Sequence, residues 1–158
     1  MNYDDLISAA TEVGYLLLRN GAEIYRVEDS MQRIFRAYGV DTGEIFAIPT
    51  CIFVTITTPE GKSITRIKRL YTRVTDLDKV DRANDLCRRI CRLCPDVGSI
   101  QEEIETINRR PVYDFGTQVA AFAMVAFSFT LFYGGTLADA FCSLFCGAGV
   151  KLVNSLMG

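Results

Sequence analysis

The sequence lacks several features that would point to catalysis or to nucleic-acid binding. It has no histidine among 158 residues, which excludes histidine-based triads, histidine zinc sites and histidine pH switches. The sequence has no Gly-rich phosphate loop of the kind that would indicate nucleotide binding. With 17 basic and 19 acidic residues, the chain lacks the excess of basic residues that is typical of nucleic-acid-binding proteins. We therefore expect no enzyme, no metal, no cofactor and no nucleic-acid partner.

Charge is also missing from the last part of the chain. Beyond Pro111 the only charged residues are Asp114, Asp139 and Lys151, whereas residues 1–111 have the composition of a soluble protein. This contrast predicts two domains, a soluble one over residues 1–111 and a membrane one over residues 112–158. No low-complexity linker separates them, and no internal repeat is visible.

The uncharged stretch from Phe115 to Ala138 has the length of a membrane span. A helix needs roughly 20 apolar residues to cross the hydrocarbon core. Gly134 and Gly135 then interrupt the helix, and a second apolar stretch follows. The sequence predicts two transmembrane helices, over about residues 113–133 and 137–157, that form a hairpin. The alternative is a buried hairpin of a soluble domain, which we disfavour because soluble cores rarely contain two consecutive helices that are apolar all round.

The charges that flank the spans predict their orientation. Arg109 and Arg110 precede the first span, and the turn at residues 133–136 has no basic residue. By the positive-inside rule, both termini are expected in the cytoplasm, as in a multi-pass protein of the cell inner membrane. The acidic N-terminus, with Asp4 and Asp5, does not resemble a secretory signal. The six cysteines are then expected to be reduced thiols.

Residues 1–111 have the pattern of an α+β domain. Helical periodicity predicts helices over residues 4–20 and 22–38. Residues 44–48, 51–57 and 62–70 favour strands, with Pro49 at a strand end and a turn at 58–61. A third helix is expected from Thr75, and Ser99 and Glu102 form a capping box for a fourth. The predicted fold class is helix–helix, a small antiparallel β-sheet, and helix–helix, followed by the transmembrane hairpin.

The spacing of three cysteines in the predicted third helix is consistent with two interpretations. Cys87, Cys91 and Cys94 match the spacing of enzymes that bind an iron–sulfur cluster through thiolates. They also extend an apolar stripe with Leu77 and Val80 at helical spacing, as core residues do. We favour the core interpretation, since Leu93 stands where that motif usually has an aromatic residue.

Polar residues in two places are candidates for function. Asp139 lies near the start of the second span, where an acid either faces a cavity, partner or ion path, or caps the helix at the interface. Both interpretations stay open. Glu23, Arg26 and Glu28 form a charge cluster after Gly21, and spacing alone favours an ordinary solvated helix face. Small residues in the second span, among them Gly147 and Gly149, favour close packing against other helices.

These segments together resemble a known family. The string from Gly21 to Glu28 (Gly-Ala-Glu-Ile-Tyr-Arg-Val-Glu), Pro49-Thr50, Thr75-Asp76-Leu77 and the Phe-Tyr-Gly-Gly…Asp hairpin at 132–139 occur in the order found in the threonine/serine exporter family, which includes two-component relatives linked to succinate export. The resemblance covers essentially the whole chain. It implies a cytosolic domain followed by the first two membrane helices of an exporter with about five spans. Glu23, Arg26 and Glu28 match the family signature without an assigned role, and Asp139 matches the membrane acid.

The resemblance implies a component of an inner-membrane exporter of threonine/serine or of a related small hydrophilic metabolite such as a dicarboxylate. Two spans instead of five indicate an incomplete membrane domain, either a fragment or a short protein that needs other chains. Besides membrane lipid, the expected partners are further copies of the chain or a small membrane subunit. The alternative function is a membrane-anchored ligand-binding or regulatory module.

Overall fold

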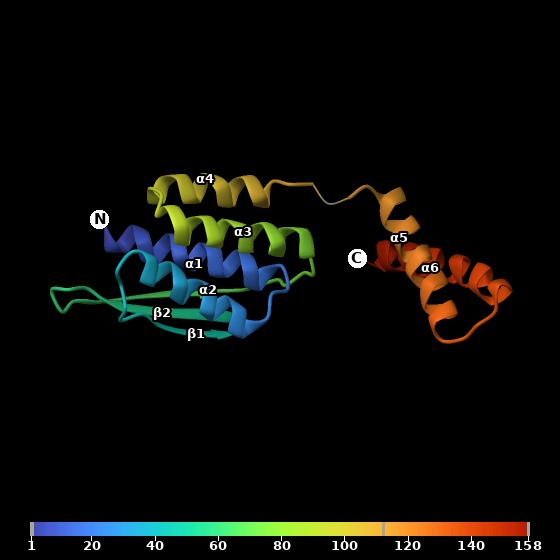
Figure 1. Cartoon of the computed structure of the whole chain (residues 1–158), viewed down its shortest axis with the longest axis horizontal. Coiled ribbons are helices and arrows are strands. Elements are labelled where there is room, and N and C mark those ends of the chain that lie inside the picture. The colour runs from blue at the N-terminus through green and yellow to red at the C-terminus, as the bar shows by residue number, and fades with distance from the viewer. Residues whose placement is uncertain (1, 112, 158) are drawn as a thin grey trace. The chain divides into compact units, whose positions relative to one another are not determined.

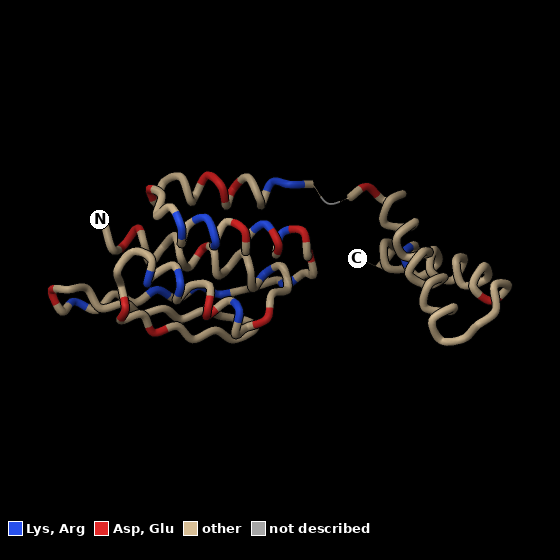
Figure 2. The backbone as a smooth tube through the Cα atoms, viewed as in Figure 1, with Lys and Arg blue, Asp and Glu red and all other residues tan. Residues whose placement is uncertain are grey.

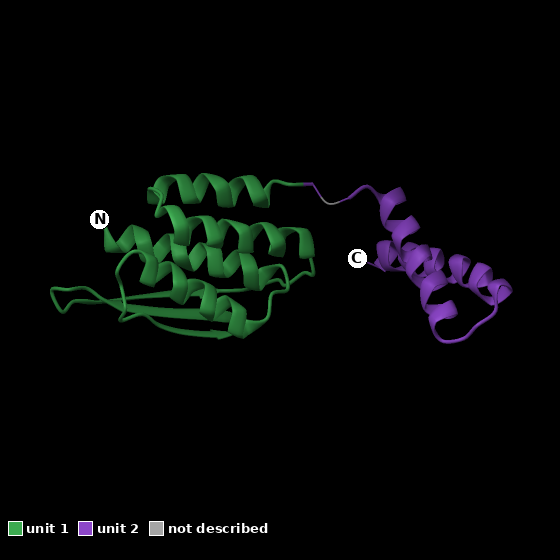
Figure 3. Cartoon of the chain, in the orientation of Figure 1, with its two compact units in different colours: residues 1–110 green, residues 111–158 purple. Residues whose placement is uncertain are grey.

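The chain folds into seven elements followed by a helical hairpin (Figure 1). The computed structural model describes residues 2–111 and 113–157. The elements, in chain order, are α1 (Tyr3–Arg19), α2 (Ile24–Ala37), β1 (Glu44–Ile48), β2 (Cys51–Thr57), β3 (Ser63–Arg69), α3 (Leu77–Leu93), α4 (Val97–Asn108), α5 (Phe115–Phe132) and α6 (Leu137–Met157). They form two compact units, residues 1–110 and 111–158 (Figure 3). The predicted combination of helices, a small sheet and two apolar C-terminal helices is confirmed.

The sheet is a three-stranded antiparallel meander with the order β1-β2-β3. Pro49 and Thr50 connect β1 to β2, because Ile48 is paired with Cys51. The turn from β2 to β3 closes with a hydrogen bond of 2.8 Å from the Gly61 amide to the Thr58 carbonyl. The predicted strands and the hairpin turn are therefore confirmed, and Pro49 lies at a strand end, where its missing N–H costs no ladder hydrogen bond.

The core of the N-terminal unit is built around α1. This helix packs against the sheet, α2, α3 and α4, so that the unit has a sheet layer, a layer of α1 and α2, and a layer of α3 and α4 (Figure 1). The helix that periodicity predicts over residues 4–20 is buried on nearly all sides. Its fully buried side chains include Leu6, Ile7, Val13, Leu16, Leu17 and Leu18.

The structure of α3 and α4 corrects three sequence predictions, which concern Leu77, Cys94 and Ser99. Leu77 is 70% exposed and Cys94 is exposed, so neither belongs to the buried stripe of α3. Cys94 instead ends the helix in a left-handed conformation with φ of 43°. Ser99 does not begin α4. Asp96 caps that helix by accepting a hydrogen bond from the Gly98 amide, and the Ser99 hydroxyl donates to the Asp96 carbonyl.

The C-terminal unit is a hairpin of two helices that are long and apolar enough to cross a membrane. The first begins at Phe115 rather than at residue 113, because Asp114 is its N-cap and accepts from the amide and the hydroxyl of Thr117 at 3.1 and 2.6 Å. The hydrogen bond from that hydroxyl is the main reason that the pKa of Asp114 lies below its usual value. No residue of α5 is buried. An exposed apolar surface of this kind fits contact with lipid better than the buried hairpin of a soluble domain.

Candidate functional site

Asp139 lies in the first turn of α6, where Thr136 holds it in a capping box. The Asp139 carboxylate accepts hydrogen bonds from the Thr136 amide at 3.0 Å and from the Thr136 hydroxyl at 2.6 Å. The Asp139 amide donates back to the Thr136 hydroxyl at 3.3 Å. This reciprocal pair satisfies backbone donors that a helix start otherwise leaves unpaired. The sequence contains this signal as Thr-x-x-Asp at residues 136–139, which is typical of a helix start.

The capping box uses only one of the two oxygens of the Asp139 carboxylate. Both contacts from Thr136 go to Oδ2, and Asp139 is exposed in the hairpin. Oδ1 therefore has no hydrogen-bond donor within the described residues. The geometry shows Asp139 as a helix cap through Oδ2, and a place for Asp139 on a transport path stays a prediction.

The turn before Asp139 depends on its two glycines. Gly134 has a φ of +84°, a conformation that side-chain-bearing residues rarely adopt. A Cβ on Gly135 would lie 2.7 Å from the Thr130 side chain and 2.9 Å from the Thr130 carbonyl, because the Gly135 amide donates to that carbonyl. The turn thus needs glycine at 134 for conformation and at 135 for space, as expected of a helix-breaking pair.

Close packing between α5 and α6 is concentrated at two small residues. Ala140 and Gly147 are the buried residues of α6. A Cβ on Gly147 would lie 2.5 Å from the Phe122 carbonyl, whereas a Cβ on Gly149 would meet nothing within 4 Å. The prediction that small residues permit close packing is therefore right for Gly147. Cys142 and Cys146 remain exposed.

The charge cluster at the start of α2 divides into two parts with different roles. Glu23 and Arg26 form an exposed ion pair of 2.9 Å, and the Arg26 guanidinium also donates to the Tyr25 hydroxyl at 3.2 Å. Glu28 points the other way and accepts a hydrogen bond of 2.8 Å from the Ala47 amide of β1. Glu28 thus fastens α2 to an edge strand, while Glu23 and Arg26 remain at the surface.

The glycine of the same string is required by a close approach of two chain segments. Gly21 has a φ of +103°, and a Cβ there would lie 3.2 Å from the Val74 carbonyl. The segment before α3 is bound to this turn through hydrogen bonds from the Val74 amide to Arg19 and from the Asp76 amide to Asn20. The Gly-Ala part of the string therefore serves the fold by joining the α1–α2 turn to the start of α3.

A polar groove of about 400 Å³ lies between α2 and α3. Its lining includes three guanidinium groups, and each of them already forms an ion pair with a carboxylate close to it in the sequence. Arg26 pairs with Glu23, Arg33 with Asp29 at 2.8 Å, and Arg88 with Asp85. The residues that line it are Tyr25, Arg26, Asp29, Ser30, Arg33, Asn84, Cys87 and Arg88. Guanidinium groups are suited to carboxylates, so the groove has the chemistry to accept a small acid.

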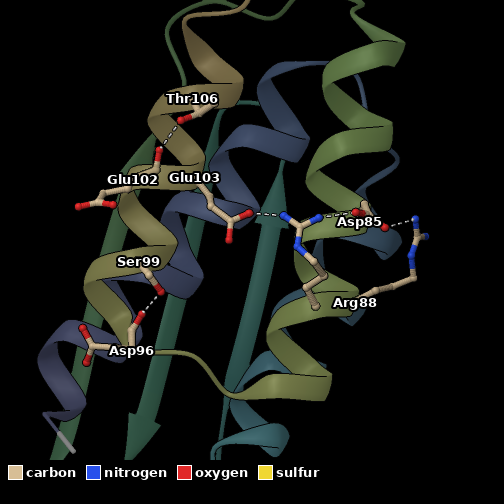
Figure 4. Close-up of polar contacts among 8 residues, drawn as sticks. Asp85, Arg88, Asp96, Ser99, Glu102, Glu103 and Thr106 are labelled. Atoms are coloured by element: carbon tan, nitrogen blue, oxygen red, sulfur yellow. Dashed lines mark hydrogen bonds and ion pairs between the residues drawn. The ribbon is translucent and has the colours of Figure 1, made fainter.

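A second polar cluster joins α3 to α4. Figure 4 shows Asp85 on α3 and Glu103 on α4, and Arg89 forms ion pairs with both. Asp85 also pairs with Arg88 at 3.3 Å. The neighbouring pocket has a volume of about 330 Å³, and the residues that line it are Asp81, Arg82, Asp85, Arg89, Glu103, Thr106 and Ile107. Because Arg89 is satisfied by two carboxylates from neighbouring helices, this cluster connects the helices and is a weaker candidate site than the groove.

The cysteines of α3 do not form one cluster. Cys87 is buried and its thiol contacts the Ser30 carbonyl, while the Cys94 thiol faces the Ala37 carbonyl. Burial raises the pKa of Cys87 to about 12 and also raises the pKa of Cys91. Since cluster ligands are thiolates, a buried neutral thiol at Cys87 fits the core interpretation. Within residues 2–111 and 113–157, no three potential ligands are grouped for a metal ion.

Comparison with known proteins identifies the class to which this architecture belongs. A family model described as "Putative threonine/serine exporter" matches residues 8–158, which cover the first unit from residue 8 onward, the whole second unit and every candidate site residue named above. The chain therefore belongs to the threonine/serine exporter family, as its sequence resemblance implies. No curated protein matches the chain, and no solved structure does. Family membership and the two apolar helices together support a membrane protein with a role in transport.

Proposed function

We propose that this chain is a component of an exporter of threonine/serine, or of a related small hydrophilic metabolite such as a dicarboxylate, in the cell inner membrane. Residues 1–110 form its cytosolic domain, and α5 and α6 form two of its transmembrane helices. The observation that carries the proposal is a family match that extends through both units. Both termini of the hairpin lie on the cytoplasmic side, in accordance with Arg109 and Arg110 before α5.

The hairpin supports a role within a larger membrane assembly. Cys142 and Cys146 are one helical turn apart on α6, and their small side chains are exposed. Small side chains at this spacing allow close contact with another membrane helix. The assembly is completed by further copies of the chain or by a small membrane partner, and lipid surrounds the remaining apolar surface.

Asp139 is the residue that we assign to the transport path. Its Oδ2 is held by Thr136, which fixes the side chain, and its Oδ1 is available to a substrate ammonium group or to a coupling ion. An acid within a membrane helix is costly and usually serves such a path. The sequence indicates no nucleotide site, so we propose that an ion gradient drives export.

The test compares export from cells that produce Asp139→Asn, Thr136→Val or the unchanged protein. Asp139→Asn keeps the shape of the side chain but removes its charge, and Thr136→Val removes the capping hydroxyl but keeps the carboxylate. We expect Asp139→Asn to cause accumulation of threonine and serine in the cells at a normal amount of protein in the membrane. If both variants lower the amount of protein and export falls only in proportion, Asp139 is a helix cap and its assignment to the path is wrong.

A second candidate function is a membrane-anchored ligand-binding or regulatory module, favoured by the groove between α2 and α3. Arg26 and Arg33 would bind the carboxylate of a metabolite there. Isothermal titration of the full chain in lipid nanodiscs with threonine, serine or succinate checks this function. Binding that disappears in Arg33→Gln and persists in Asp139→Asn would support the module. Absence of binding to the unchanged chain would refute it.

A further inference from the structure

We propose that the N-terminal unit docks on an anionic lipid surface through the end from which the chain leaves towards α5. The docking surface consists of Arg69, Tyr71, Arg73, Val74 and Leu77, which we call the exit surface. All five residues lie between the end of β3 and the first residue of α3. The inference rests on the proposed function, in which α5 and α6 span a membrane.

The chain leaves the N-terminal unit beside this surface. The Lys79 ammonium group of α3 donates to the Asn108 carbonyl at the end of α4 at 3.3 Å. The Arg110 guanidinium forms an ion pair of 3.4 Å with Asp78. The C-terminal end of α4 is thereby fixed next to the N-terminal end of α3, which directly follows the exit surface, and Figure 1 shows both ends on the same side of the unit.

The length of the connection limits how far this end can lie from the bilayer. Only residues 111–114 separate Arg110 from the start of α5 at Phe115. An extended chain gains at most about 3.6 Å per residue, so five steps reach at most about 18 Å. If α5 enters the membrane at Phe115, the exit end of the unit lies near the interface for any arrangement of the two units.

The exit surface is held in place by backbone hydrogen bonds at both of its ends. The Leu70 amide donates to the Thr50 carbonyl and the Val74 amide to the Arg19 carbonyl, both at 2.8 Å. The Arg73 guanidinium donates to the Ala22 carbonyl at 3.0 Å. Apolar side chains in this segment are therefore exposed by a defined backbone, and their exposure does not result from a loose loop.

The side chains of the exit surface combine apolar area with positive charge. Tyr71 is 82% exposed, Leu77 70% and Val74 50%. The Arg69 guanidinium stacks over the Tyr71 ring at 5.5 Å. Tyrosine with arginine is the combination found where protein meets the headgroups of a bilayer, since the ring is amphipathic and the guanidinium binds phosphate.

Charge favours anionic over neutral lipid. Arg69 and Arg73 have no carboxylate partner among residues 2–111 and 113–157, whereas Arg109 and Arg110 nearby pair with Glu105 and Asp78. An unpaired basic residue near an anionic surface is attracted to it. Acidic residues occur at this end of the unit as well as at the start of α1 (Figure 2). Those that flank Leu77 are paired, Asp76 with Lys79 at 3.8 Å and Asp78 with Arg82 at 3.0 Å, so they do not neutralise Arg69 or Arg73.

The absence of tryptophan from the chain allows a direct test. Single tryptophan reporters are introduced into the full chain, which is reconstituted into phosphatidylcholine vesicles with or without phosphatidylglycerol. Lipids with a spin label near the headgroup quench a tryptophan that lies at the interface. Tyr71→Trp reports on the exit surface. Leu93→Trp is the matched control, because Leu93 is 73% exposed at the far end of the same helix that begins at Leu77, about 24 Å away.

We expect strong quenching of Tyr71→Trp in vesicles that contain phosphatidylglycerol and little quenching of Leu93→Trp. In the Tyr71→Trp background, Arg69→Gln should reduce the quenching to about half, and Arg69→Lys should retain most of it. Equal quenching of Tyr71→Trp and Leu93→Trp would overturn the proposal, as would quenching that does not depend on phosphatidylglycerol.

A third reporter separates this proposal from the proposed function. Met124→Trp lies at the middle of α5, where Met124 is 63% exposed, and should be quenched by a spin label deep in the acyl chains. If Met124→Trp is quenched and Tyr71→Trp is not, the hairpin is inserted and only the docking surface is wrong. If Met124→Trp is not quenched, α5 does not span the membrane, and both proposals fail.

Discussion

Glu28 of α2 accepts a hydrogen bond of 2.8 Å from the backbone amide of Ala47 in β1. The bond joins a helix to an edge strand, and the side chain of Ala47 is buried in the core beneath it. It gives Glu28 a structural role that distinguishes it from its neighbours Glu23 and Arg26 in the family string. The difference between the two parts of the cluster leads to the first prediction.

Glu28→Ala should destabilise the N-terminal unit by about 1–3 kcal/mol, because the half-buried amide of Ala47 loses its partner. Thermal unfolding of the purified chain in detergent, followed by circular dichroism, measures the effect. Glu23→Ala is the control and should cost less than about 1 kcal/mol, since its ion pair with Arg26 is exposed. Equal losses for Glu28→Ala and Glu23→Ala would contradict the division of the cluster.

Gly21→Ala should be more destabilising than Gly39→Ala. Both glycines have positive φ, at +103° and +77°, so both variants carry a conformational cost of about 1–2 kcal/mol. Only Gly21 adds a steric cost, because its new Cβ would press on the Val74 carbonyl, while a Cβ on Gly39 meets nothing within 4 Å. Comparison of the two melting temperatures isolates this contact. A lower melting temperature for Gly39→Ala would show that the contact with Val74 is not tight.

Gly147→Ala should loosen the hairpin, and Gly149→Ala should leave it intact or stabilise it. The first Cβ would collide with the Phe122 carbonyl at 2.5 Å, and the second enters open space and removes a flexible glycine from a helix. Overpacking of this kind typically costs about 1–3 kcal/mol. A disulfide between cysteines introduced on α5 and α6 would form more slowly in Gly147→Ala if the prediction is right. Identical rates in the two variants would oppose it.

Stability should fall at alkaline pH in a way that depends on Cys87. Burial raises the pKa of this thiol from 9.0 to about 12. The contribution of the neutral thiol is fully present below pH 9. It is lost between pH 9 and about 12, because the unfolded chain ionises there and the folded chain does not. The slope from this group is at most about 1.4 kcal/mol per pH unit.

Urea titrations of the unchanged chain and of Cys87→Ala over pH 8 to 10 measure this slope. The variant should be less stable at pH 8 but should lose less stability as the pH rises. Parallel curves for the two proteins would show that Cys87 ionises normally. Alkylation is a second readout: exposed Cys94 should react with iodoacetamide at pH 8 well before Cys87.

The sequence by itself determined the elements and their order. β-favouring residues, the Thr58–Gly61 turn and Pro49 placed the three strands, and helical periodicity placed α1 to α3, because these signals are local. The charge-free stretches and the Gly134-Gly135 pair predicted the hairpin for the same reason. The Gly-Ala-Glu-Ile-Tyr-Arg-Val-Glu string and the ordered motifs were sufficient for the family, which the match over residues 8–158 confirms.

Only the tertiary structure decided what surrounds each side chain. It showed that α1 is buried on nearly all sides, that Glu28 faces β1 while Arg26 faces solvent, and that Leu77 and Cys94 are exposed. Such facts depend on neighbours that are distant in the chain, as Glu28 is from Ala47 and Gly21 from Val74. Local periodicity can tell which residues share a face of a helix, but the partner of that face is chosen by packing among all elements at once.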